Sequence, residues 1–112
     1  MSTTPPPAHR TLTIEHTTDA HGTPVLVCRG RMNLESAEQF KAEVKQLASE
    51  HKHVDADLAG VDSVDSAGLG SLLGTYISAK NQGCDLQLIK VHPHVKDLLN
   101  MTHLTQVLHV EG

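Results

Sequence analysis

The chain has 112 residues and a formal net charge of −4 at pH 7. A chain of this length corresponds to one domain, and such a domain hides roughly 65% of the surface of its unfolded chain. Phe40 and Tyr76 are the only aromatic residues, which argues against a nucleic-acid binder that stacks bases. The negative charge argues against binding to a phosphate backbone, and no apolar run approaches the ~20 residues of a membrane span.

The first part of the chain predicts a tail followed by a hairpin. Residues 1–10 contain a run of three prolines without apolar periodicity, so we expect a flexible tail before a domain that spans residues 11–112. Alternation with Leu12 and Ile14 on one face predicts a strand over residues 11–17. A second strand is predicted over residues 24–29, after a turn at residues 19–22.

A helix is predicted next, after a break at residues 30–34. Ser36, with Gln39 three residues later, fits a capping box at its start. Apolar residues at helical spacing form one stripe and polar residues form the wet side. The apolar residues are Ala37, Phe40, Val44, Leu47 and Ala48, and the polar ones are Glu38, Lys41, Glu43, Lys45 and Gln46.

The second half alternates strands and helices. A third strand over residues 53–58 places Val54, Ala56 and Leu58 on one face and Asp55 and Asp57 on the other. A helix ending near residue 82, a strand over 86–89, a helix starting at residue 93 and a strand over 107–110 follow. The fold class is therefore α/β, a mixed sheet flanked by helices in the order β-β-α-β-α-β-α-β, with mostly parallel pairing and one antiparallel edge.

The stretch from Val61 to Gly70 is predicted as the turn between the third strand and the second helix. Ser66 occupies a favoured N-cap position, where its hydroxyl can accept a bond from a free backbone N–H. Gly68 and Gly70 leave the first helical turn without side chains, so a ligand or partner can approach it closely. Because a helix start carries partial positive charge, an exposed hydroxyl there suits a phosphate or a protein partner.

This stretch resembles the STAS domain family, and within it the small single-domain anti-sigma factor antagonists of bacteria. The resemblance is carried by DLAGV at residues 57–61 and by VDSAGLG at residues 64–70, with support from residues 30–33 and 92–99. It spans roughly residues 11 to 110. Asn33 stands where the family commonly has an aspartate. Asp55 replaces an apolar strand residue, which suggests that this strand face is partly open or that Asp55 is paired.

The resemblance implies a protein-binding switch that catalyses nothing and uses no cofactor. Such a domain binds an anti-sigma factor and thereby releases the sigma factor. The anti-sigma factor is also a kinase that phosphorylates the serine matching Ser66, and a phosphatase reverses this. We expect the partner to bind where loops gather at the carboxyl ends of the strands, on a face made of Met32, Asn33, Asp62, Asp65, Ser66, Gly68 and Leu69.

Other functions fit the sequence less well. A hydrolase nucleophile needs Gly-x-Ser-x-Gly, and Val64 occupies the first glycine position. The glycines at 68, 70 and 74 lack the Lys-Ser or Lys-Thr pair of a nucleotide loop, and close packing of the helix at Gly70 and Gly74 explains them better. A ligand- or nucleotide-sensing module of the same fold remains the alternative.

The sequence predicts no metal site and no disulfide. Asp57, Asp62 and Asp65 lack the calcium-loop pattern, and the histidine pairs at 51/53 and 92/94 lack further ligands nearby. Cys28 and Cys84 lie in or beside predicted strands, so two free thiols are expected and a disulfide is the less favoured alternative. Since no secretory signal is recognisable, we expect a cytoplasmic protein that binds neither membranes nor nucleic acids directly.

Overall fold

A computed structural model of the chain describes residues 12–111, so the tail expected at residues 1–10 lies outside the described part. The elements are β1 (Leu12–Thr18), β2 (Pro24–Met32), α1 (Leu34–Ala48), β3 (His53–Val64), α2 (Ser66–Asn81), β4 (Asp85–Ile89), α3 (Pro93–Met101), a short 3₁₀ turn (Leu104–Gln106) and β5 (His109–Val110). The five strands lie in sequence order in one sheet. Strand β1 is antiparallel to β2 and the other pairs are parallel, which confirms the predicted fold class and order.

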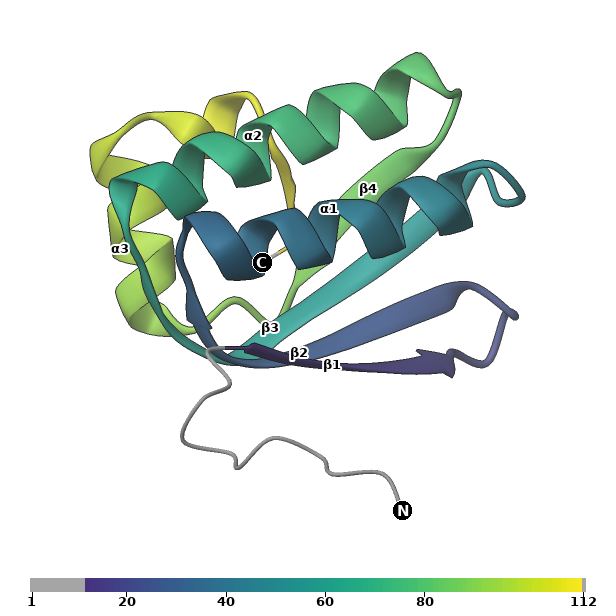
Figure 1. Cartoon of the computed structure of the whole chain (residues 1–112), viewed down its shortest axis with the longest axis horizontal. Helices are drawn as coiled ribbons and strands as arrows, with labels where there is room; N and C mark the ends of the chain where they lie inside the picture. Colours follow the sequence, from purple (N-terminus) through teal and green to yellow (C-terminus); the bar gives the residue numbers. More distant parts are fainter. Residues whose placement is uncertain (1–11, 112) are drawn as a thin grey trace.

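The helices cover one face of the sheet. Helices α1 and α2 lie side by side on this face, and α3 lies at the end where β2 and β3 finish (Figure 1). Val54, Ala56 and Leu58 of β3 are buried, whereas Asp55 and Asp57 between them are only half-buried. The predicted division of this strand into two faces is therefore confirmed, and no helix within residues 12–111 covers the aspartate face.

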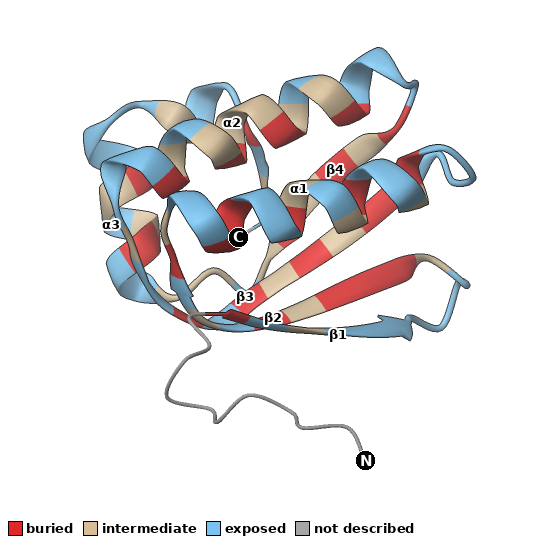
Figure 2. Ribbon diagram, viewed as in Figure 1, coloured by how far each residue is buried: buried red, intermediate tan, exposed pale blue. Residues whose placement is uncertain are grey.

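The core between helices and sheet is almost entirely aliphatic. Figure 2 shows the buried sides of α1 and α2 turned toward the buried sides of the strands. Phe40 is the one fully buried aromatic ring among the described residues. Both cysteines are buried and free, as the sequence predicts. Burial raises the pKa of the Cys28 thiol to about 12, so this thiol stays protonated and unreactive at neutral pH.

Two strands are longer than their sequence patterns indicate. Strand β2 continues to Met32, where a break was expected, and β3 continues to Val64, through the expected turn. The reason is mutual pairing, because Gly30 pairs with Val61 and Met32 pairs with Val64. Residues that look like loop when read alone become strand when a parallel neighbour satisfies their backbone groups.

Helix α1 begins earlier than predicted because Asn33, not Ser36, is its N-cap. The Asn33 side-chain oxygen accepts a hydrogen bond from the Ser36 amide at 3.0 Å, and the Ser36 hydroxyl accepts one from the Asn33 amide at 2.9 Å. Ser36 thus belongs to a capping box as its third helical residue rather than its cap. Glu43, expected on the wet side, is instead half-buried and contacts the His16 ring of β1.

The glycines of α2 have roles opposite to those expected. A Cβ at Gly68 would lie 2.2 Å from the Met32 carbonyl oxygen, so this glycine permits close backbone contact between α2 and the end of β2. Cβ atoms at Gly70 and Gly74 would meet nothing within 4 Å. The prediction that Gly70 and Gly74 allow close helix packing is therefore wrong, and Gly68 has that function.

Substitution of these glycines by alanine should have effects of opposite sign. Gly68→Ala should destabilise the domain by at least about 1–3 kcal/mol, because the clashing atom belongs to the backbone and cannot rotate away. Gly70→Ala, the matched control in the same helix, should stabilise it by up to about 1 kcal/mol through helix propensity. Urea unfolding of both variants measures the difference. Similar free energies of unfolding would contradict the proposed contact.

Candidate functional site

The candidate site is the place where the first turns of α1 and α2 lie next to each other. Met32 ends β2 and pairs with Val64 at the end of β3. Directly after that pair, the Asp65 amide donates a hydrogen bond to the Met32 carbonyl at 3.1 Å, and Gly68 contacts the same carbonyl. Both helix starts are therefore fixed to one point at the carboxyl ends of two parallel strands.

Ser66 is the first helical residue of α2 and is exposed. Its hydroxyl makes no hydrogen bond to any residue within the described range, so the expected capping role of Ser66 is wrong. Asp65 is the cap, because its extended backbone lets the carboxylate oxygen accept a hydrogen bond from the Gly68 amide at 2.7 Å. Since the capping task falls to Asp65, the Ser66 hydroxyl is available for another reaction or contact.

The other residues predicted for the partner face differ in how far they are exposed. Asp65 directly precedes Ser66 and is exposed, and Asp62 is exposed two residues before the end of β3. Asn33 and Leu69 are half-buried; Asn33 caps α1, and Leu69 packs partly against the core.

Met32 and Gly68 cannot contact a partner in this structure. Met32 is only 1% exposed and belongs to the core, so its expected role as an adaptable surface contact is wrong. Gly68 is buried, and the Met32 backbone covers the position that was expected to be open. Both residues instead set the position of the exposed ones.

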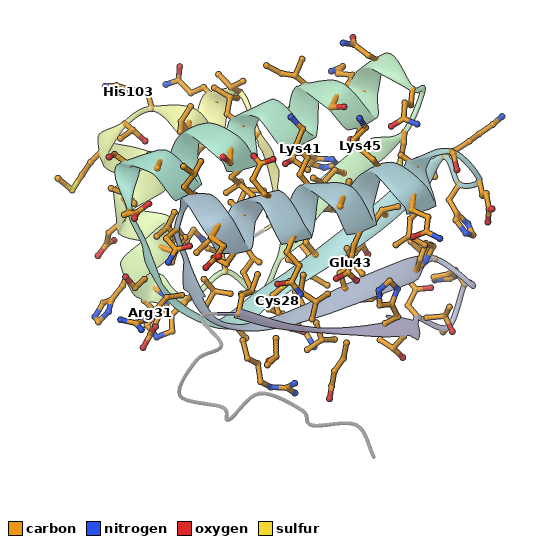
Figure 3. The ribbon with its side chains drawn as sticks, viewed as in Figure 1. Cys28, Arg31, Lys41, Glu43, Lys45 and His103 are labelled. Atoms are coloured by element: carbon orange, nitrogen blue, oxygen red, sulfur yellow. The ribbon has the colours of Figure 1, made fainter. Side chains whose placement is uncertain are left out.

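Two exposed residues at this place were not recognised from the sequence. Leu34 is the first residue of α1, the position equivalent to Ser66 in α2, and is 59% exposed. Arg31 is exposed near the end of β2 (Figure 3), where it pairs through its backbone with Ser63. The three-residue spacing from Asn33 to Ser36 was the available signal, because it places a helix start at Leu34. We call the exposed residues Arg31, Leu34, Asp62, Asp65 and Ser66 the helix-start face.

The charges of the helix-start face are mixed. Two helix N-termini bring partial positive charge, and Arg31 adds a cation. Exposed carboxylates come from Asp62, from Asp65 and from Glu35, which lies in the first turn of α1. Within residues 12–111 no group of three histidine, cysteine or acidic side chains is placed to hold a metal ion. The arrangement suits recognition by a protein and acceptance of a phosphoryl group by the Ser66 hydroxyl.

Stability measurements should separate the roles of the two neighbouring residues. Asp65→Ala should lower the free energy of unfolding by about 1 kcal/mol, since it removes the side-chain acceptor for the first turn. Ser66→Ala should change stability by only a few tenths of a kcal/mol, because alanine is a good first-turn residue and no hydrogen bond is lost. Denaturant titration of both variants measures this, and an equal loss for both would restore Ser66 as a cap.

Solved structures similar to this fold include several anti-sigma factor antagonists. The antagonist from Mycobacterium paratuberculosis has a TM-score of 0.73 at 18% identity, covering 88% of this chain and 84% of that one. The antagonist SpoIIAA in its unphosphorylated form has a TM-score of 0.68 at 16% identity, covering 89% of each chain. A STAS domain protein from Planctomyces limnophilus has a TM-score of 0.67 at 20% identity, covering 88% of each chain. At these identities the likeness concerns the fold.

None of the helices in the described part of the chain has the length and hydrophobicity that crossing a bilayer requires.

The family assignment comes from the sequence match. The family model described as "Mlab, STAS domain" matches residues 15–110, which include nearly the whole sheet, all three helices and both helix starts of the site. With a match of this extent on a sheet and helix arrangement shared with solved STAS domains, the chain belongs to the STAS domain family.

Proposed function

We propose that this domain is an anti-sigma factor antagonist that binds an anti-sigma factor through the helix-start face while Ser66 is unphosphorylated. The observation that carries the proposal is the Ser66 hydroxyl at the first residue of α2, which is exposed, has no hydrogen bond to another described residue and lies beside a second helix start. SpoIIAA, which shares the fold, has been solved in both unphosphorylated and phosphorylated forms. Binding would displace the sigma factor from the anti-sigma factor.

The proposed cycle needs two activities that the domain does not supply. The anti-sigma factor acts as a serine kinase that phosphorylates Ser66, and a phosphatase removes the phosphate. The domain is a binding component of this cycle, without catalysis or a cofactor of its own, and it acts in the cytoplasm where sigma factors operate. A kinase can reach Ser66 without moving the backbone, because the side chain is exposed and unbonded among the described residues.

Phosphorylation should alter this surface without unfolding the domain. The phosphate adds about −1.5 to −2 charges. The start of α2 stabilises an anion by about 0.3–1 kcal/mol, whereas the neighbouring Asp65 carboxylate repels it by about 1 kcal/mol per unit charge at ~4 Å in water. The Asp65 carboxylate is held beside the site by its bond to the Gly68 amide, so this repulsion persists. The net cost to the free domain is therefore at most about 2 kcal/mol, which is small enough to leave it folded.

In the complex the same phosphate is unfavourable. Leu34, at the equivalent position of α1, offers 59% of its surface, so the matching partner surface is expected to be apolar there. A neutral hydroxyl fits beside such a contact, but a doubly charged phosphate would lose water without matched partners. Leaving a charge poorly satisfied costs several kcal/mol, and 1.4 kcal/mol already corresponds to tenfold in affinity.

The affinity for the cognate anti-sigma factor should therefore fall at least about tenfold when Ser66 is phosphorylated. Calorimetric titration of the phosphorylated and unmodified forms measures this, and circular dichroism with thermal melting checks that the fold is unchanged. Ser66→Ala should bind like the unmodified protein and should take no phosphate from the partner and ATP. Equal affinities, or a binding loss that tracks unfolding, would refute the switch. Nucleotide binding without any anti-sigma partner would favour the sensing module.

Charge reversal should locate the binding face. Asp62→Lys should change the affinity for the anti-sigma factor, because Asp62 is exposed in the helix-start face. Glu50→Lys is the matched control, since Glu50 is exposed just beyond the other end of α1. Glu43 is unsuitable as a control, because it contacts His16. Similar effects at Asp62 and Glu50 on the dissociation constant would argue that only net charge matters.

A further inference from the structure

The sheet face without helices contains a groove that the proposed function does not use. The groove has a volume of about 470 Å³, and Thr17, Val25, Val27, Asp55, Asp57 and Ile89 are among its lining residues. Its lining residues alternate along β2 and β3 with the core residues Leu26, Ala56 and Leu58. It therefore lies on the sheet face opposite to α1 and α2, the two helices that Figure 1 shows on the other face. The helix-start face, by contrast, lies at the carboxyl ends of the strands.

The groove combines an acidic stripe with apolar walls. Asp55 and Asp57 both project from the uncovered face of β3. In the strand register Asp55 lies beside Val25, and Asp57 lies between Val27 of β2 and Ile89 of β4. A side chain with methylene groups and a cationic end matches this surface, because its stem can pack on valine or isoleucine while its charge meets a carboxylate.

The negative charge of the groove is not neutralised within the described chain. Asp19, Asp55, Asp57 and Glu111 line it, and Lys90 is the one cationic residue among the described residues of the lining. The Lys90 ammonium lies 3.9 Å from an Asp57 carboxylate oxygen. The Asp55 carboxylate has no hydrogen bond or ion pair with another described residue, although its backbone pairs with β2 and β4.

The pKa of Asp55 reflects its burial and the uncompensated negative charge of the groove. Burial raises the pKa of the Asp55 carboxyl, and the nearby negative charges of Asp19, Glu111 and Asp85 raise it further, while His109 opposes them. A raised pKa means that the folded state disfavours the ionised form, so the charge is less stable here than in the unfolded chain. A cation brought by a ligand would offset the neighbouring negative charges and would compensate the carboxylate for the water it has lost.

We propose that this groove binds an extended segment of a partner protein that carries two cationic side chains two residues apart. Along a strand, residues two apart lie on the same face and are separated by about 6.4–6.8 Å. Asp55 and Asp57 have this spacing, and alternate side chains of an extended segment have it as well. Two arginines in such a segment can therefore reach both carboxylates at once, with their stems over the apolar walls. A nucleic acid is disfavoured because the carboxylates would repel its phosphates.

A pair of synthetic peptides tests the spacing. One capped seven-residue peptide carries Arg-Thr-Arg at its centre, flanked by serine and threonine. The other has the same composition but adjacent arginines, which point to opposite sides of an extended chain. Titration followed by amide NMR shifts should show the alternating peptide binding about fivefold or more tightly. The shifts should occur at Val25, Val27, Asp57 and Ile89, and should shrink with added salt.

Matched variants test the residues. The Asp55→Asn/Asp57→Asn double variant should lose about fivefold or more in affinity for the alternating peptide. Asp57 accepts a hydrogen bond from the Ala59 amide at 3.0 Å, and the side-chain oxygen of an asparagine at position 57 can still accept it. Removing the Asp55 charge should not lower the melting temperature at neutral pH, because the raised pKa of Asp55 shows that the folded state disfavours this charge. Asp97→Asn, an equal type of charge change at an exposed position of α3, should leave the affinity unchanged, as should Ser66→Asp.

Several results would overturn the proposal. Equal binding of the two peptides, or an equal loss in the Asp97→Asn control, would mean that only net charge attracts the peptide. Shifts confined to the helix-start face would place the contact elsewhere. Self-association in sedimentation equilibrium that the double aspartate variant abolishes would assign the groove to a second copy of this chain. None of these results bears on the Ser66 switch, which the anti-sigma titration tests separately.

Discussion

The backbone contact between Gly68 of α2 and the Met32 carbonyl is the constraint on which the site depends. It requires a residue without a side chain, since a Cβ would come within 2.2 Å of that oxygen. The same carbonyl accepts the Asp65 amide, and the next residue, Asn33, caps α1. The starts of both helices are thereby fixed relative to each other, and Ser66 is held outward at a defined place.

Strand β3 connects the helix-start face, the groove on the uncovered side of the sheet and the hydrophobic core. Its buried residues contact the helices, its aspartates face the uncovered side of the sheet, and its last residues lead into the helix-start face. A strand that is buried on both faces in a parallel sheet is normally apolar throughout. Strand β3 can carry Asp55 because no helix within residues 12–111 covers that side of the strand.

The order of elements was predictable because it depends on local periodicity, whereas the ends of elements depend on distant partners. The burial of Met32 follows from its pairing with Val64, which no short stretch of sequence reveals. The choice of cap was decided between neighbours, Asp65 and Ser66, by which side-chain oxygen reaches the Gly68 amide. The exposure of Ser66 was predicted correctly, although for a different reason. The sequence also suggested an open face at Asp55 but could not show the groove, because its walls come from separate strands.

The parallel pairing of β2 with β3 affects the order in which the chain can fold during synthesis. Strands β1 and β2 form a local hairpin, but a two-stranded hairpin is at best marginally stable in water. The inner residues of that hairpin, Leu26 and Cys28, are fully buried in the finished domain, and this burial needs α1 and the crossover to β3. Until Leu58 has left the ribosome, the apolar side of the hairpin stays in contact with water. The first half of the chain therefore gains its stability only together with the second.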